Sequence, residues 1–428
     1  MVNSRVKKTS ILVLHAGHYP YEKWDDHPFI GKELRALAAY FERVIVLCYP
    51  ARDKRPSGVH GNIEFPPKYN INPNGFLGKL QIVLFSIISP LTYCEIYRTP
   101  KIFTSFNAFM YLLRFVGLTE INKKWLKKNI FNRSEYNLDT TIFYTFNLDR
   151  EAMALGLLKE KWPEIKLISR ARGFDFQEER YSLSYIPFRE STLKNVDHIY
   201  FLSDYGKDYM VERYPQITGK SSVSPRGIDI PNFINPQSND GVIRFVSCSN
   251  VIPLKRVDLI AESIVELARQ FPRQNYKWTH IGDGVELDRI VNMIKRISPN
   301  NLQCTFLGRI PNKSVIDHYR NNSVDLFIHM SRMEGGRPSA IQEALSCGIP
   351  VLAANVGGVS ELMTKNVGLM LPADPGVKDI VSAISCLLNN DEQLIEYRRN
   401  SQIFAQKELD AKNNCRSFAE HLTRIFSG

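Results

Sequence analysis

Short β-branched and aromatic runs alternate with helical patterns in the second half of the chain, which is typical of a parallel sheet covered by helices. Between the first two runs, Val257, Ile260, Ile264 and Leu267 recur at helical spacing. The first half repeats the alternation less regularly. The strand-like runs are residues 10–15, 43–48, 141–146, 166–171, 198–203, 243–249, 276–282, 304–308, 324–330, 349–355 and 367–371. The sequence therefore predicts an α/β protein with two doubly wound sheets.

The stretch "IPNFINPQSNDG", residues 230–241, breaks both periodicities with its prolines, asparagines and glycine. We therefore predict two domains, 1–232 and 241–404, and a helical C-terminal segment, 405–428, that crosses back to the first domain. Two doubly wound domains joined by one linker should face each other across a cleft. Such sheets bind ligands at the carboxyl ends of their strands.

Composition agrees with a folded, soluble chain of 428 residues, of which 44% are apolar and 23% charged. The seven cysteines are scattered, with no CxxC and no Cys/His cluster at metal-ligand spacing, which predicts a cytosolic protein with cysteines in its core. The longest uncharged run, Leu80–Cys94, is interrupted by Pro90 and is shorter than a spanning helix requires. We therefore predict no transmembrane helix.

Most of the net charge of +11 lies in the first half, because residues 1–239 hold 33 Lys/Arg against 24 Asp/Glu. Within it, the segment 117–129 at helical spacing places Leu118, Ile121 and Trp125 opposite the lysines Lys123, Lys124, Lys127 and Lys128. This pattern fits a solvated helix face. It also fits a helix on an anionic bilayer, to which Leu80–Cys94 would add a shallow apolar contact, or a platform for a polyanionic acceptor.

The segment "HMSRMEGGRPSAIQEALSCG", residues 329–348, carries the clearest candidate chemistry. A buried strand should end near Met330, and a helix should begin near Pro338–Ser339 after a glycine-bearing loop. Loop amides and the helix N-terminus then form an anion site suited to a diphosphate. Glu343, one turn into the helix, can bind ribose hydroxyls, and Glu334 on the loop can bind a second sugar. This arrangement describes a site for a nucleotide sugar.

These motifs resemble those of the retaining family-4 glycosyltransferases, whose GT-B fold has two Rossmann-like domains that face each other. The resemblance extends over most of the chain and includes "FVSCSNVIPLKRVDLI", "HIGDGVELDRI", "FLGRI" and "SRARGFDF" in family order. The N-terminal stretch "HYPYEKWDDHPFIGKEL" is similar to bacterial members that build surface polysaccharides.

The resemblance implies roles for individual residues. Glu334, Lys255 and Arg172 would be catalytic, and Lys255 and Arg256 would hold the donor phosphates. His15 and His18 follow the first strand, where an acceptor contact and a structural role are both open, and Asp175 could equally brace its own turn. The donor-binding set is Glu343, Arg256, Asn250, Gly335, Gly336, Arg309, Ile310, Ser339 and Gly282, and the acceptor-side set is His15, Gly17, His18 and Asp175.

Three positions depart from the family pattern. Eight residues separate Glu334 from Glu343 where the family has seven, an insertion that the glycines at 335 and 336 can absorb. Asn250 replaces an arginine, which places more of the phosphate charge on Lys255 and Arg256. Arg172 replaces the usual histidine, and an arginine can stabilise charge but cannot transfer a proton at neutral pH.

Some motifs have simpler alternatives. The "GDG" turn at 282–284 is not a dinucleotide fingerprint, because Leu287 occupies the place of the third glycine, which argues against a dehydrogenase. Gly357 and Gly358 could form only a tight turn, or a turn that approaches the donor with support from Glu361.

The sequence is thus interpreted as a metal-independent retaining glycosyltransferase that needs no cofactor and lacks the DxD motif of metal-dependent enzymes. Its expected partners are a nucleotide diphosphate sugar, a glycan or lipid-linked acceptor and an anionic membrane surface, but no nucleic acid. We expect it in the cytoplasm, peripheral at the inner face of the cell membrane. Two alternatives remain open, a nucleotide-sugar epimerase or hydrolase of the same fold and a non-catalytic binding protein.

Overall fold

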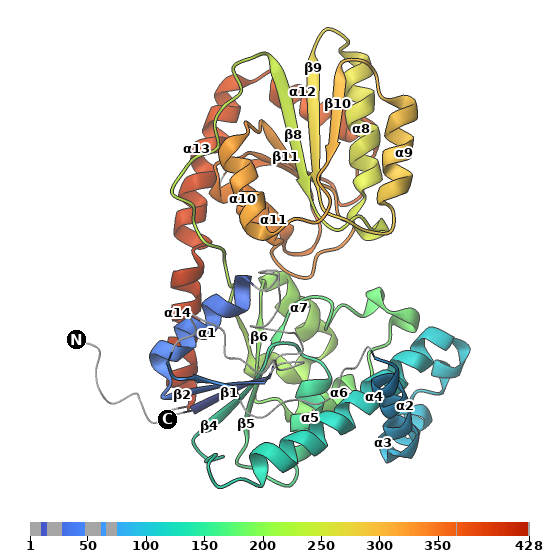
Figure 1. Ribbon diagram of the computed structural model, residues 1–428, viewed down its shortest axis with the longest axis vertical. Coiled ribbons are helices and arrows are strands. Elements are labelled where there is room, and N and C mark those ends of the chain that lie inside the picture. Colours follow the sequence, from blue (N-terminus) through green and yellow to red (C-terminus); the bar gives the residue numbers. More distant parts are fainter. Residues whose placement is uncertain (1–9, 15–27, 48–60, 66–74, 365, 427–428) are drawn as a thin grey trace, which may run out of the picture. The chain divides into compact units, whose positions relative to one another are not determined.

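The protein consists of two compact α/β units, seen in a computed structural model that describes residues 10–14, 28–47, 61–65, 75–364 and 366–426 (Figure 1). The first unit ends at Ser224 and also includes the chain from Cys415 onward, and the second unit is Pro225–Asn414. Each unit contains one parallel sheet. The prediction of two doubly wound α/β domains is therefore confirmed.

The first unit has a seven-stranded sheet in the order β3-β2-β1-β4-β5-β6-β7. Its strands are β1 (Ser10–Leu14), β2 (Arg43–Leu47), β3 (Ile63–Glu64), β4 (Thr141–Thr145), β5 (Lys166–Ala171), β6 (His198–Phe201) and β7 (Ser221–Val223). Its helices are α1 (Pro28–Tyr40), α2 (Phe76–Ile88), α3 (Pro90–Arg98), α4 (Phe106–Leu126), α5 (Arg150–Lys159), α6 (Arg189–Asn195), α7 (Asp204–Arg213) and α14 (Ala411–Phe426).

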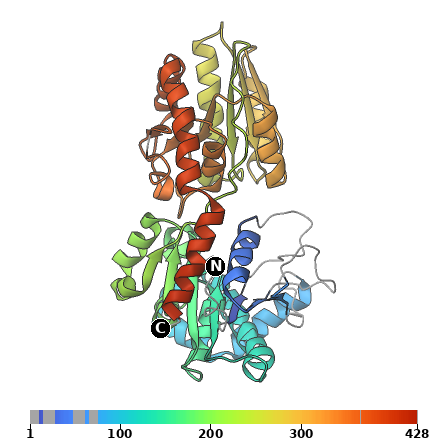
Figure 2. The same ribbon diagram turned by 90° about the vertical axis from the view of Figure 1, so that its left-hand side faces the viewer.

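Alternate side chains of the central strands supply two separate cores. In β4, Phe143 packs with α5 and its neighbours on one face, whereas Ile142 and Tyr144 pack with α1 and α14 on the other. All five residues of β4 are buried, as expected for a parallel strand covered on both faces. The C-terminal helix contributes Phe418 and Leu422 to the second core, so the end of the chain is part of the first unit (Figure 2).

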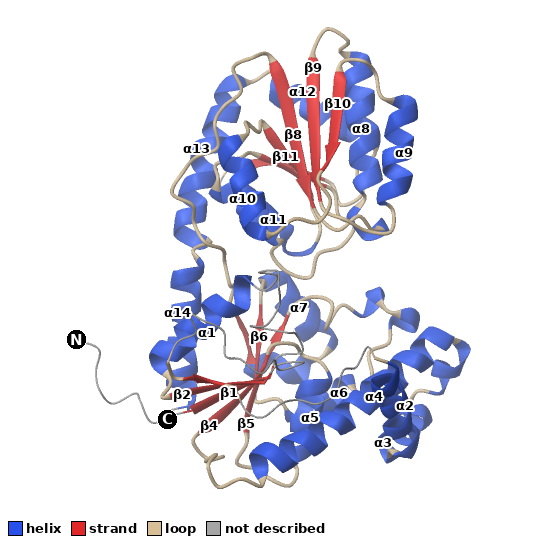
Figure 3. Cartoon of the chain, viewed as in Figure 1, coloured by secondary structure: helices blue, strands red, loops and turns tan. Residues whose placement is uncertain are grey.

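The second unit has a six-stranded sheet in the order β10-β9-β8-β11-β12-β13, with helices on both faces (Figure 3). Its strands are β8 (Val242–Cys248), β9 (Asn275–Ile281), β10 (Leu302–Phe306), β11 (Leu326–His329), β12 (Val351–Ala354) and β13 (Gly368–Leu371). Its helices are α8 (Val257–Gln270), α9 (Leu287–Ile297), α10 (Asn312–Asn321), α11 (Ser339–Ser346), α12 (Val377–Leu388) and α13 (Asp391–Glu408).

The predicted linker, residues 230–241, is an integral part of the second unit rather than a free connection. The Asn235 amide donates to the carbonyl oxygens of Tyr319 and Asn322, and its oxygen accepts from the backbone N–H of Val324. Asn235 also donates its own backbone N–H to Cys347 at 2.8 Å. Asparagine breaks periodicity in the sequence, but here its side chain replaces the missing backbone hydrogen bonds.

The stripe of Leu118, Ile121 and Trp125, predicted to oppose the lysines, packs into the protein. Leu118 and Ile121 in α4 are buried against Ile82 of α2, and Trp125 packs against the same cluster. The stripe of Leu118, Ile121 and Trp125 is therefore part of the core, and these three side chains are not available for a membrane.

The uncharged run at Leu80–Cys94 bends at Pro90, as its sequence predicts. Ser89 caps α3, and Pro90 begins it, so the chain turns by 67° between α2 and α3. In the described part of the chain, no single helix is long and apolar enough to cross a membrane, although the bent α2–α3 pair passes by length and composition.

A buried ion pair ties the first unit together. Arg170 of β5 and Glu33 of α1 are 0% and 1% exposed and lie 2.9 Å apart. Arg170 also donates to the Tyr144 hydroxyl and to the carbonyl oxygen of Ser224, and its guanidinium lies 4.0 Å from the ring centre of Phe418. Burial opposes the charge, but Glu33 outweighs it and raises the pKa of Arg170 above its usual value. One side chain therefore links α1, β4, β5 and α14.

We predict that Glu33→Gln destabilises the first unit by about 3–5 kcal/mol, because it leaves a buried guanidinium without its counter-charge. Urea unfolding, with hydrogen exchange of the β4 and β5 amides to localise the effect, measures it. The control is Glu64→Gln, which breaks the more exposed pair with Arg43 and should cost less than about 1 kcal/mol. Equal losses in the two variants would contradict the prediction, and Glu33→Leu combined with Arg170→Met should recover most of the stability.

Candidate functional site

The segment 329–348 folds as the sequence predicts. The strand β11 ends at His329, a loop follows, and α11 begins at Ser339 with Pro338 as its N-cap. Ser339 is half-buried and is the first residue inside the helix. The first N–H groups of α11 thus lie directly after the glycine-bearing loop.

Glu334 is the centre of a charged cluster at the carboxyl end of β11. Its Oε1 accepts from the Lys255 ammonium and lies 2.9 Å from His329 Nε2, which is 3.0 Å from the Ser331 hydroxyl. Burial alone would raise the pKa of Glu334, but the His329 hydrogen bond and the Lys255 charge outweigh it and hold the pKa well below its usual range. Glu334 is therefore a fixed anion, able to accept hydrogen bonds and unable to supply a proton near neutral pH.

Two glycine pairs hold the Glu334 loop by direct backbone contact. Gly357 has φ of +54°, and a Cβ there would overlap the carbonyl oxygen of Glu334. A Cβ on Gly358 would come within 2.6 Å of the Gly336 carbonyl group. Gly335 is itself buried within the loop. The second pair is therefore more than a tight turn, because it sets the position of the catalytic candidate Glu334.

An ion pair also joins the Glu334 loop to the segment that follows Gly358. Arg337 Nε lies 2.9 Å from Glu361, and both side chains are largely buried. The backbone oxygen of Arg337 also accepts from the Gln342 amide at 2.9 Å. Glu361 therefore supports the loop through Arg337.

Glu343 lies one turn into α11 and is 7% exposed. Its Oε1 accepts from the Asn312 amide at 2.7 Å. Burial and the nearby charge of Glu343 raise the pKa of the Cys248 thiol to about 12, which places this carboxylate close to the end of β8. Asn312 is a site residue that sequence reasoning missed, because an asparagine that opens a helix carries no signal that it reaches another helix.

Lys255 and Arg256 are adjacent in sequence, but their side chains contact different groups. Lys255 reaches Glu334, whereas Arg256 is 3% exposed and has φ of +49° at the N-cap of α8. The Arg256 guanidinium donates to the carbonyl oxygens of Met330, Ser331 and Ala373 and pairs with Asp374. Four of the five guanidinium N–H groups are thereby committed. In this structure Arg256 positions the loops, and Lys255 is the cation at the site.

The remaining donor-side residues lie on loops at the same ends of the strands. A Cβ on Gly282, whose φ is +143°, would overlap the carbonyl oxygen of Ser249. A Cβ on Gly284 would likewise overlap the carbonyl oxygen of Val251. Asn250, between these two contacts, has an exposed side chain. Gly282 also donates to the Gly308 carbonyl at 2.9 Å. After that contact come Arg309, which is exposed, and Ile310, which is half-buried.

In the first unit, Asp175 holds its own turn. Its carboxylate accepts backbone N–H groups from Leu148, Arg172 and Gly173 at 2.6–3.1 Å. Burial still raises the pKa of Asp175, against these bonds. Asp175 thus braces its own turn, which is one of the two roles that the sequence left open.

Arg172 lies over two aromatic rings, with its guanidinium carbon 4.7 Å from the centre of Phe146 and 5.2 Å from that of Phe174. Its Nε is buried and has no hydrogen-bond partner within the described ranges. Burial lowers the pKa of Arg172. The other acceptor-side candidates, His15, Gly17 and His18, lie outside the described residues.

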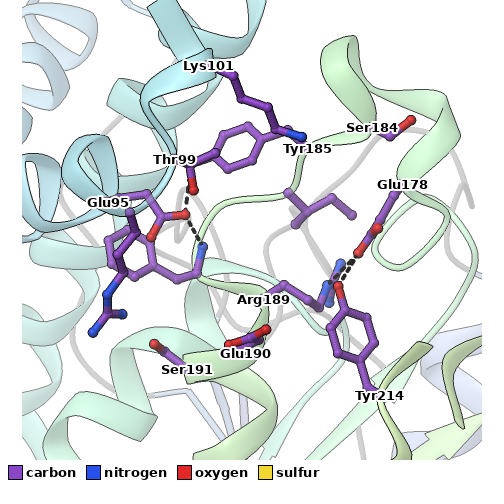
Figure 4. Close-up of a pocket in the computed structure, with 13 residues that line it drawn as sticks. Glu95, Thr99, Lys101, Glu178, Ser184, Tyr185, Arg189, Glu190, Ser191 and Tyr214 are labelled. Atoms are coloured by element: carbon purple, nitrogen blue, oxygen red, sulfur yellow. Dashed lines mark hydrogen bonds and ion pairs between the residues drawn. The ribbon is translucent and has the colours of Figure 1, made fainter.

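A polar cavity of about 560 Å³ in the first unit was not foreseen from the sequence (Figure 4). Glu95 lies on one wall and binds the Tyr185 hydroxyl at 3.0 Å, and on the other Glu178 accepts from Tyr214 (Figure 4). Ser184 and Phe188, which also line it, have positive φ of 47° and 54°. Strained non-glycine residues are enriched at binding sites, but they leave no pattern in a sequence.

No group of three or more His, Cys, Asp or Glu side chains is placed to hold a metal ion in the part of the chain that is described.

Comparisons with known proteins identify relatives of this chain. Residues 231–404 match the family described as "Glycosyl transferases group 1". A phosphatidylinositol N-acetylglucosaminyltransferase component of Arabidopsis thaliana is 28% identical over 257 residues, which make up 55% of this chain and 54% of that protein. The chain thus matches about half the length of this relative.

Solved structures show the same fold over nearly the whole chain. Sucrose-phosphate synthase from Thermosynechococcus elongatus has a TM-score of 0.70 at 15% identity and covers 98% of this chain and 100% of its own. Anabaena HepE, solved with UDP-glucose, has a TM-score of 0.63 at 14% identity and covers 97% and 100%. The fold is GT-B, and residues 231–404 of the second unit are similar to the glycosyltransferase group 1 family.

We predict that Gly357→Ala displaces the Glu334 loop and weakens the binding of nucleotide-sugar ligands at least about tenfold, since a Cβ cannot share space with the Glu334 carbonyl. Calorimetric titration with a nucleotide sugar that stabilises the wild-type protein measures the loss. The control is Gly241→Ala, which has a similar φ of +73° but no atom within 4 Å of its Cβ. The prediction is wrong if both variants bind like the wild type or lose affinity equally.

Proposed function

We propose that this chain is a retaining glycosyltransferase that moves a sugar from a nucleotide diphosphate sugar to a glycan or lipid-linked glycan acceptor in surface polysaccharide synthesis. The observation that carries the proposal is the ionised Glu334, paired with Lys255 and held by His329 just before the N-terminus of α11. The glycosyltransferase group 1 match covers all of these residues. The compartment we propose is the cytoplasm.

Glu334 suits the donor sugar in this proposal. Because Lys255 and His329 keep its carboxylate charged, it acts as a hydrogen-bond acceptor for sugar hydroxyls and not as an acid. Glu343, buried beside Asn312, suits the two hydroxyls of a ribose. The diphosphate would lie between the two carboxylates, against the first N–H groups of α11.

Lys255 would stabilise the departing phosphate. As the bond to the sugar breaks, negative charge grows on the phosphate oxygen, and the ammonium and the α11 amides are positioned to neutralise it. The acceptor proton then passes to that phosphate oxygen on the same face of the sugar, which retains the anomeric configuration. Arg256 contributes indirectly, by fixing the backbone at Met330 and Ser331 next to the cluster. In this proposal, Lys255 and the α11 amides neutralise the phosphates without a metal.

Glu343→Ala and Glu334→Ala should separate the two sugar roles. Glu343→Ala should weaken nucleoside diphosphate and nucleotide sugar alike, by about 1.5–3 kcal/mol for a lost charge-assisted hydrogen bond. Glu334→Ala should leave nucleoside diphosphate affinity nearly unchanged and reduce turnover.

Thermal-shift screening with UDP, GDP and ADP and their sugars identifies the base of the donor, since a ligand at a hundred times its Kd stabilises the protein by about 2.7 kcal/mol.

The matched control for these variants is Glu262→Ala, because Glu262 is an exposed carboxylate on α8 in the same unit. Unchanged nucleoside diphosphate affinity in Glu343→Ala would exclude the ribose role. Sugar release from the donor with no acceptor present, at the full rate, would indicate a hydrolase instead of a transferase.

Lys255→Ala should lower turnover by about two orders of magnitude or more, the usual effect of removing a partner of transition-state charge. A coupled assay of nucleoside diphosphate release measures it, with Lys378→Ala, an exposed lysine on α12, as the control. Activity should persist in EDTA. Activity lost in EDTA and restored by Mg²⁺ or Mn²⁺ would show that Lys255 and α11 do not neutralise the phosphates alone.

A further inference from the structure

We propose that the exposed apolar surface of α2, α3, η1 (Pro100–Thr104) and the start of α4 docks on a lipid bilayer that carries anionic head groups. The four elements contact one another, and α2 and α3 lie together at one edge of the first unit (Figure 1). Their exposed large apolar side chains are Phe76, Leu77, Leu80, Leu84, Ile87, Ile88, Tyr93, Tyr97, Phe103, Phe106 and Met110. So many exposed apolar side chains on neighbouring elements mark an interaction surface.

The helix α2 is amphipathic in the opposite sense to an ordinary surface helix. Its buried residues are Gly78, Ile82 and Ser86, and two of these three are small. Its exposed side carries Leu77, Leu80, Leu84, Ile87 and Ile88 at helical spacing, and Ile88 is 76% exposed. A helix of a water-soluble protein turns its apolar stripe to the core. Here the larger apolar side chains face outward.

Small residues explain how α2 packs without using those side chains. A Cβ on Gly117 of α4 would overlap the backbone carbonyl of Ile82, so the two helices approach at their backbones. The Ser86 and Thr92 hydroxyls donate to backbone carbonyls nearby, which leaves them satisfied inside the contact. Close packing through glycine and serine, with leucine and isoleucine outside, is the pattern of helices in a lipid environment.

Charge favours an anionic bilayer as the occupant of this surface. From Phe76 to Phe131 the only acidic residues are Glu95 and Glu120, and both are buried. Glu95 accepts from Tyr185 and Phe188, and Glu120 accepts from Ser89 and Lys123. The exposed charges between Phe76 and Phe131 are therefore all basic, namely Lys79, Arg98, Lys101 and Arg114, and, at the end of α4 and just after it, Lys124, Lys127 and Lys128. Basic residues beside an apolar surface bind acidic lipid head groups.

The bend between α2 and α3 limits how deeply this surface enters. α2 has 13 residues, about 20 Å of helix, and the 67° turn at Pro90 prevents one continuous span. The apolar side chains would therefore enter the head-group and upper acyl region. The cavity of Figure 4 is lined by Arg98 and Lys101 from these same elements, so head groups would lie next to it. This contact would make the protein a peripheral membrane protein.

Two native cysteines provide a direct test. Cys94 on α3 and Cys386 on α12 are both exposed. A polarity-sensitive fluorophore is attached to Cys94 in one variant (Cys386→Ser) and to Cys386 in the other (Cys94→Ser), with Cys48→Ser in both. Vesicles of phosphatidylcholine and phosphatidylglycerol should shift the emission of the Cys94 label to shorter wavelength and leave that of the Cys386 label unchanged. No shift at either position, or an equal shift at both, overturns the proposal.

Flotation of the full chain with the same vesicles tests whether the exposed side chains of α2 bind the bilayer. Leu77→Ser, Leu84→Ser and Ile88→Ser together should reduce the bound fraction about tenfold or more, whereas Ile395→Ser with Ile403→Ser, at exposed positions of α13, should not change it. Binding should weaken in high salt and on pure phosphatidylcholine, because head-group attraction is screened. All variants should keep their nucleotide affinity. A failure of the membrane proposal can therefore be distinguished from a failure of the proposed donor site. Self-association of the wild type without vesicles, abolished by the three serines, would instead assign the surface to a second copy and overturn the proposal.

Discussion

Direct contact between backbones is the constraint on which the second unit's site depends. At the carboxyl ends of its strands, loops from different strands touch with no side chain between them, and only glycine fits at Gly282, Gly284, Gly357 and Gly358. The contacts of Gly357 and Gly358 fix the loop that carries Glu334, and those of Gly282 and Gly284 fix the neighbouring loop at Ser249 and Val251. Small displacements of a charged group change its electrostatic effect strongly, so a rigid backbone is what makes the Glu334 cluster specific.

The charged residues of the motifs divide into two kinds. Arg256 and Asp175 are buried, and their polar atoms are occupied by backbone groups that would otherwise lack partners. They preserve the shapes of two turns. Lys255, Glu334 and Glu343 instead bond to other side chains, which can exchange for a ligand at little cost. A motif therefore contains both the groups that meet a substrate and the groups that hold them in place.

The helix α2 places its apolar side chains differently from the rest of the protein. In the second unit and in the sheet of the first, large apolar side chains fill the interior and small ones are incidental. In α2 two of the three buried residues, Gly78 and Ser86, are small, and the large apolar side chains are mostly exposed. The inner contact is stabilised by close van der Waals approach, as it is where the hydrophobic effect offers no preference for the interior. This difference supports the proposed contact of α2 with a lipid bilayer.

The sequence by itself determined the two parallel sheets, the break at Pro90 and the strand–loop–helix around Glu334, because periodicity, proline and glycine act through local geometry. Tertiary structure alone decided that residues 230–241 belong to the second unit, that Asn312 meets Glu343, and that Arg256 braces loops while Lys255 faces the site. It also decided which side of α2 faces outward. These outcomes depend on partners distant in sequence, and a local pattern shows what a residue is able to contact but not which neighbour the fold brings to it.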